Sequence, residues 1–140
     1  MSQTAAALST DAQTEIATAL NQCVAETVVT TMLAQNFHWN VTGMAFGPLH
    51  DLFQKIYEDH FEAQDDLAER VKARGAHANG KLADMVAASK ISEHDGHASA
   101  EDMISTLANA QRTVAATLAG TADIAEKHGD LLPQDLCIER

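Results

Sequence analysis

The stretch NFHWNVTGMAFGPLH, residues 36–50, sets both the fold and the chemistry that this chain can support. It carries two histidines, His38 and His50, separated by a short segment that contains Gly43 and the pair Gly47-Pro48. Glycine at a cap followed by proline at the first helical position is typical of a helix start. We therefore expect His38 in the last turn of one helix and His50 in the first turn of the next. The positive helix end there would favour the neutral, metal-binding imidazole.

Both flanking segments have helical periodicity. The first helix is predicted over residues 10–39, opened by Thr10 and Gln13 as a capping box. It has one small or apolar face made of Ile16, Leu20, Cys23, Thr27, Thr31 and Ala34.

The second helix is predicted over residues 48–74, ending at Gly75, and it has two occupied faces. The face that we expect to pack on the bundle carries Leu49, Phe53, Ile56, His60, Ala63, Leu67 and Val71. The face left for a partner carries His50, Gln54, Tyr57, Phe61, Asp65 and Glu69.

The rest of the chain completes an all-α plan. A link over residues 75–98 contains a candidate short helix at 81–89, because an unstructured link of that length is unusual in a compact domain. Ser99 and Asp102 cap a third long helix that ends near His128 and Gly129. A last segment, starting at Pro133, is shorter than the ~12–15 residues of a marginal isolated helix. We therefore expect residues 1–140 to form one four-helix-bundle domain, with its last helix truncated.

The composition narrows the classes of function. A net charge of −11 disfavours nucleic acid and favours cations. Cys23 and Cys137 are the only cysteines, with no CxxC motif, which favours a reducing compartment. The first 20 residues have no Lys or Arg and no signal-peptide pattern, and no apolar run approaches the ~18 residues of a membrane span. The sequence predicts a cytoplasmic protein.

Histidine and carboxylate side chains together suit a transition metal such as iron. On the second helix, Asp65 and Glu69 share a face, but His50 lies fifteen residues before Asp65, roughly 22 Å along a helix. One chain cannot close that gap around an ion. Two such helices, antiparallel about a two-fold axis near Tyr57 or Glu58, would bring His50 of one subunit beside Asp65 and Glu69 of the other.

A metal site inside the bundle is disfavoured, because no glutamate is followed by histidine three positions later. Each candidate residue also has a plain structural interpretation. His50 could be an exposed histidine at a helix start, and His38 a packed one beside Trp39. Asp65 and Glu69 could form a solvated helix face.

Taken together, residues 36–43, Phe46, Leu49-His50 and residues 65–70 resemble the Dps family, the DNA-protecting, ferritin-like miniferritins of bacteria. The resemblance implies a hollow dodecamer that acts as a ferroxidase. Such a shell oxidises Fe(II), preferably with hydrogen peroxide, and stores the ferric mineral inside. It also implies that the cell uses the protein against oxidative stress, in the cytoplasm or at the nucleoid.

The resemblance further implies the roles of single residues. His38 and His50 would be iron ligands and catalytic residues from one subunit, and Asp65 and Glu69 would come from its two-fold mate. Trp39 would lie close to the site. Acidic residues around the start of the last helix, Asp130 and Asp135, would be candidates for lining a three-fold iron entry pore.

Three departures from the family pattern leave alternatives open. Gln54 stands where the family usually has a carboxylate, so the chain could form a cage with an impaired metal site that holds zinc or nothing. A protein that binds and compacts DNA is a second alternative, but residues 1–20 lack the basic tail that counterion release requires. The family's last helix also runs well past the equivalent of Arg140.

Overall fold

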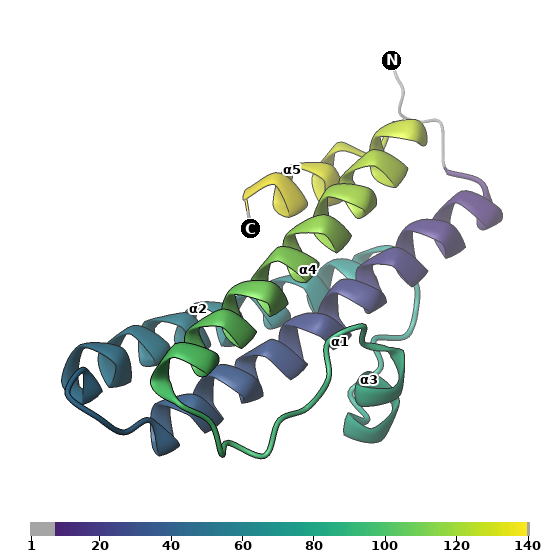
Figure 1. Cartoon of the computed structure of the whole chain (residues 1–140). Coiled ribbons are helices and arrows are strands. Elements are labelled where there is room, and N and C mark those ends of the chain that lie inside the picture. The colour runs from purple at the N-terminus through teal and green to yellow at the C-terminus, as the bar shows by residue number, and fades with distance from the viewer. Residues whose placement is uncertain (1–7, 140) are drawn as a thin grey trace.

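The computed structural model describes residues 8–139, which form five helices and contain no strand. The long helices are α1 (Thr10–Asn40), α2 (Phe46–Ala73) and α4 (Ala100–Lys127). The short helices are α3 (Leu82–Ala88), within the link, and α5 (Leu131–Glu139). Figure 1 shows the three long helices side by side, with α3 against α1 and α5 against α4. The predicted all-α bundle with a short helix in its link is confirmed. None of the described helices is long and apolar enough to cross a membrane.

The predicted helix starts were close but not all correct. The cap of α1 is Ser9, whose Oγ accepts a hydrogen bond from the backbone N–H of Ala12, rather than Thr10. Helix α2 begins at Phe46, two residues before Pro48. Proline is tolerated at that position because an N–H in the first turn of a helix has no intrahelical acceptor, and proline has no N–H. His50 therefore lies just beyond the first turn. The helix-end effect that we expected to favour its neutral form has largely faded at that depth.

The later boundaries follow the same physical rules. Ser99 caps α4 as predicted, by accepting from the backbone N–H of Asp102. Helix α2 stops before Gly75, which has a φ of 76°, a left-handed conformation that glycine adopts without strain. Helix α5 begins at Leu131 rather than Pro133.

The core lies between the inward faces of α1, α2 and α4. The six positions predicted for the packed face of α1 are all buried. On α2, Phe53, Ala63, Leu67 and Val71 are buried, while Leu49 and Ile56 are partly buried against the core. On the face predicted for a partner, Phe61, Asp65 and Glu69 are exposed, whereas His50, Gln54 and Tyr57 are half-buried, so only the later half of that face is open.

A buried carboxyl group joins three parts of the bundle. Glu26 of α1 is 0% exposed. Its Oε1 accepts from the Thr117 hydroxyl of α4 at 2.5 Å, and its Oε2 accepts from the Gln22 amide at 2.7 Å. The backbone N–H of Lys90, in the link after α3, donates to Oε2 at 3.2 Å. Burial of a carboxyl group is tolerated because these donors satisfy it.

Amides on α1 also hold the backbone of the link. The Asn21 side chain donates to the carbonyl of His77 at 3.0 Å, and Gln22 donates to the carbonyl of Ala88 at 2.8 Å. Near the other end of α1, Asn36 donates to the carbonyl of His94 at 2.8 Å. These bonds give irregular backbone the partners that it would otherwise lose on packing.

Candidate metal centre

The two histidines of the opening stretch meet face to face. His38 is buried in the last turn of α1, and His50 is half-buried near the start of α2. Their ring centroids are 3.6 Å apart and the planes differ by only 18°. The short connection between the helices therefore brings together the two imidazoles that the sequence placed twelve residues apart.

Each ring is hydrogen-bonded to the backbone of the other histidine. The Nδ1 atom of His38 lies 2.7 Å from the carbonyl oxygen of His50, and the Nδ1 atom of His50 lies 2.7 Å from the carbonyl oxygen of His38. A carbonyl oxygen can only accept, so both Nδ1 atoms must carry the hydrogen. In the neutral rings, both Nε2 atoms then keep a free lone pair. This tautomer is the one in which a histidine binds a metal while a backbone carbonyl orients it.

Two further aromatic rings contact this pair. Phe46 stacks on His50 with centroids 5.0 Å apart, and the Tyr57 ring meets His38 edge-on at 5.3 Å. Sequence reasoning gave neither side chain a role at the site. The spacing signal was present, since Phe46 and Tyr57 lie one helical turn before and two turns after His50. Trp39, which the resemblance placed close to the site, is 57% exposed.

The two carboxylates lie toward the other end of α2. Asp65 and Glu69 are exposed and one helical turn apart. The neighbouring Asp65 raises the pKa of Glu69, first through a side-chain hydrogen bond and then through charge repulsion. A cation between the two would relieve that repulsion.

The structure brings His38 to His50 and Asp65 to Glu69, but it does not bring the two pairs together. Helix α2 is continuous from Phe46 to Ala73, so roughly 22 Å separates His50 from Asp65 along its axis. Within residues 8–139, no three His, Cys, Asp or Glu side chains converge as a metal site. A shared site therefore needs a second subunit, and the four-residue ligand set stays a prediction.

Gln54 lies one turn after His50 and is half-buried. Its Nε2 donates to the Glu58 carboxylate at 3.3 Å. The amide nitrogen is thus turned toward Glu58, which leaves its oxygen as the side chain's neutral acceptor.

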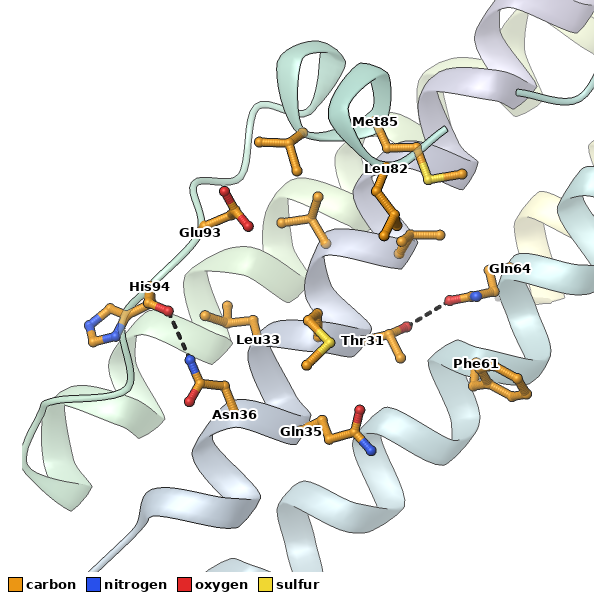
Figure 2. Close-up of a pocket in the computed structure, with 14 residues that line it drawn as sticks. Thr31, Leu33, Gln35, Asn36, Phe61, Gln64, Leu82, Met85, Glu93 and His94 are labelled. Atoms are coloured by element: carbon orange, nitrogen blue, oxygen red, sulfur yellow. Dashed lines mark hydrogen bonds between the residues drawn. The ribbon is translucent and has the colours of Figure 1, made fainter. Parts of the chain in front are cut away.

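An apolar groove of about 310 Å³ lies on the outer face of α1, between α2 and α3. Figure 2 shows Leu82 and Met85 reaching in from α3 and Phe61 and Gln64 standing on α2. Leu82 is 68% exposed and Phe61 is 65% exposed. A second hollow shares Phe61, Gln64 and Met85 with this groove and extends it to Asp65. Exposed apolar surface of this kind is typical of protein–protein interfaces and of ligand grooves.

The acidic residues suggested for an entry pore differ in their surroundings. Asp130 is buried, and its carboxylate accepts from the Arg74 guanidinium at 2.7 Å. It is therefore engaged within its own subunit and is not a free pore-lining carboxylate. Asp135, on α5, is exposed.

The ferritin-like domain family matches residues 17–139. A DNA protection during starvation protein of Brevibacillus brevis is 33% identical over 92% of this chain and 87% of its own length. The chain belongs to the Dps family.

Solved Dps structures agree with this assignment. The crystal structure of a Dps protein from Bacillus brevis superposes with a TM-score of 0.90 and 32% identity, covering 94% of this chain and 89% of that one. The Dps protein from Vibrio cholerae O1, described as a member of a superfamily of ferritin-like diiron-carboxylate proteins, gives a TM-score of 0.91 at 26% identity. It covers 94% of this chain and 83% of that one.

Proposed function

We propose that this protein is an iron-storing ferroxidase that removes Fe(II) and hydrogen peroxide together in the bacterial cytoplasm. The observation that carries the proposal is the reciprocal hydrogen bonding of the stacked His38 and His50 rings, which leaves the Nε2 atom of each neutral ring free to bind a metal. The ferritin-like domain supports iron as the metal that is bound.

The second half of each site would come from a two-fold mate. Two antiparallel α2 helices whose axis crosses near Tyr57 or Glu58 would place Asp65 and Glu69 of one subunit beside His50 of the other. The apolar groove that reaches Asp65 supports this interface, since the mate would cover Phe61 and Leu82. We propose that such dimers assemble into a hollow dodecamer that holds the ferric mineral.

The reaction balances with hydrogen peroxide as the oxidant. Two ferrous ions give one electron each, the O–O bond breaks, and two protons are taken up to form two waters. The imidazole and carboxylate ligands hold the ferrous substrate at a fixed position, so that the electrons pass to peroxide without release of hydroxyl radical. Within this chain, Phe46 stacks on the His50 ring and Tyr57 contacts the His38 ring edge-on, which helps to hold the two imidazoles in place.

Gln54 favours a second candidate function. A neutral amide oxygen attracts a ferrous ion less than a carboxylate would, so a second metal position near His50 should fill weakly. The alternative is a cage whose sites hold zinc or remain empty.

The relatives named for DNA protection raise a third candidate, a protein that compacts DNA. We propose instead that protection comes from removal of iron and peroxide, because the chain has 20 acidic residues against nine basic ones. Retention of DNA in a gel shift at low salt would favour the compacting protein.

The decisive experiment is an anaerobic Fe(II) titration of the assembled particle, followed by addition of peroxide. We expect ferric absorbance to develop faster than in buffer, and the particle mass to match a dodecamer. The His50→Ala variant should lose this acceleration. The matched control is His97→Ala, which removes an exposed histidine from the link and should retain the activity. Ferric absorbance no faster than in buffer would contradict the ferroxidase, and tight zinc binding would then support the alternative.

A further inference from the structure

The most exposed aromatic side chain of this protein lies outside its core. Phe61 of α2 is 65% exposed, compared with 57% for Trp39 and 45% for Phe46. Figure 2 shows it on α2 beside the apolar groove. It also belongs to the face of α2 that we expect to meet a second subunit. An aromatic ring on such a face stabilises an assembly when the partner removes the ring from water.

The two-fold axis that brings the metal ligands together also decides which residue Phe61 meets. An axis between Tyr57 and Glu58 is the one that places the histidines of one subunit beside the carboxylates of the other. Gln54 and Phe61 stand at equal distances on either side of that axis. They are seven residues apart, which is two helical turns, so they share one face of α2. Phe61 of one subunit therefore faces Gln54 of its mate, and the symmetry makes this contact twice.

The contact follows from the shared metal site by geometry. Two helices that cross at an angle move apart with distance from the crossing point. Gln54 and Phe61 lie nearer to the axis than His50 and Asp65 do. Two α2 helices that are close enough to hold one ion between His50 and Asp65 must therefore bring Gln54 and Phe61 at least as close.

The two halves of this face are complementary in shape and in charge. In the later half, Phe61, Asp65 and Glu69 are exposed, whereas His50 and Gln54 in the earlier half are half-buried. An antiparallel pair of α2 helices lays the prominent half of each subunit on the recessed half of the other. The carboxylates then meet imidazoles and the aromatic ring meets a neutral side chain, so no like charges oppose each other.

The Gln54 side chain is suited to lie beneath an aromatic ring. Its amide nitrogen donates to the Glu58 carboxylate at 3.3 Å on its own helix, and its two methylene groups offer apolar surface. A carboxylate at this position would lose its hydration under the ring and would need a cation to compensate. The glutamine and the exposed phenylalanine therefore suit each other, although nothing joins them within one subunit.

We propose that Phe61 of each subunit packs on Gln54 of its two-fold mate and closes off the metal position that a carboxylate at residue 54 would serve. The contact rests on the proposed dimer, and it limits each shared site to one firmly held ion. That ion lies between the histidines of one subunit and the carboxylates of the other. The second ferrous ion of each reaction then reaches the first from solution, without an anchored position of its own.

A cross-link tests the contact without any metal. The Gln54→Cys/Phe61→Cys variant is assembled with a chelator present and oxidised with diamide, since a disulfide needs Cα atoms within ~7 Å of each other. We expect a covalent dimer on a non-reducing gel, which dithiothreitol returns to the monomer. Each single variant should stay monomeric, because its two like thiols would be about 10 Å out of register along the helices. The single variants also control for the buried Cys23 and Cys137.

The outcomes of the cross-link are decisive whether or not the protein oxidises iron. No covalent dimer in assembled particles of the double variant would overturn the contact, and a covalent dimer in a single variant would overturn the register. If the double variant does not assemble, the two single variants are refolded together. Their mixed dimers place one Gln54→Cys thiol opposite one Phe61→Cys thiol and should give the same covalent dimer, and its absence would also overturn the contact.

Co(II), which takes nitrogen and oxygen ligands, tests the effect on metal occupancy. Assembled particles are loaded, desalted and assayed for retained metal, and the metal that His50→Ala retains is subtracted as background. Wild type should retain one ion per subunit and Gln54→Asp/Phe61→Ala a second. The matched control is Gln54→Asp/Leu82→Ala, which removes a 68% exposed side chain of α3 from the same groove and should retain no more than Gln54→Asp alone.

The metal assay separates failure of this proposal from failure of the ferroxidase. An equal gain in the two double variants, or a second ion retained by wild type, would overturn the role of Phe61. Wild type that retains no Co(II) above the background would contradict the proposed metal site and with it the limit of one ion. The cross-link would still decide the contact between Phe61 and Gln54.

Discussion

Division of the site between subunits predicts that two inactive variants can restore each other. His50→Ala removes one half of each site, and Asp65→Ala removes the other half. In a mixed dimer, one site then combines both damaged halves, while the other combines the intact histidines of one subunit with the intact carboxylates of its mate. Each mixed dimer should therefore contain one working site of its two.

The size of the recovery follows from this geometry. The two residues are roughly 22 Å apart on one straight helix, so no intact site can form within a single chain. Equal amounts of two variants that pair at random give mixed dimers in about half of the cases, and half of their sites are intact. The mixture should regain about a quarter of the wild-type rate of peroxide-driven ferric absorbance.

The assay unfolds the two variants together, refolds them, and compares particles of equal mass and equal protein content. The matched control mixes His38→Ala with His50→Ala. Both lesions lie in the same half-site, so no combination of these chains contains an intact site and the rate should stay at the background. The proposal that each site takes ligands from two subunits would be refuted by equal recovery of the rate in the test mixture and the control mixture. It would also be refuted if the test mixture assembled into particles but regained no activity.

Three further predictions concern the fold. Gly96→Ala should lower the free energy of unfolding in urea by about 1–3 kcal/mol, because the φ of Gly96 is 88° and a Cβ there would collide with the Asn36 side chain of α1. The control is Gly80→Ala, whose added Cβ would meet open space, and it should lower the free energy of unfolding by less. Glu26→Ala should cost about 1–3 kcal/mol in the same assay, because the backbone N–H of Lys90 loses its acceptor, while Thr117 and Gln22 keep the carbonyls of Thr113 and Ala88. The hydrogen bond from His128 lowers the pKa of Glu15 below its ordinary value of 4.5. The pair therefore stabilises the fold fully at pH values above 4.5, and this stabilisation is lost as the pH falls through the lowered pKa. His128→Ala should bring the Glu15 pKa back toward 4.5 in an NMR titration.

Much of the fold could be predicted, because helix faces and helix ends follow local rules. The packed faces of α1 and α2 follow from spacing alone, and α3 follows from the improbability of a long bare link. The errors were also local. Ser9 and Thr10 are adjacent hydroxyl residues, and either could have capped α1. Pro48 tolerates more than one place in a first turn, so it did not fix where α2 begins.

The site was less predictable, because its decisive contacts join parts that are distant or irregular. The bonds between His38 and His50 depend on the direction of two backbone carbonyls, which periodicity does not specify. The pairing of Arg74 with Asp130 joins residues 56 positions apart and removed a candidate pore residue.

The crossed hydrogen bonds of the histidine pair also limit how this protein can change. Each imidazole is oriented by the main chain of the other, so loss of either ring releases the carbonyl that it occupied and removes one restraint on the junction between α1 and α2. Substitutions at His38 and His50 should therefore be strongly non-additive, with the first causing most of the damage.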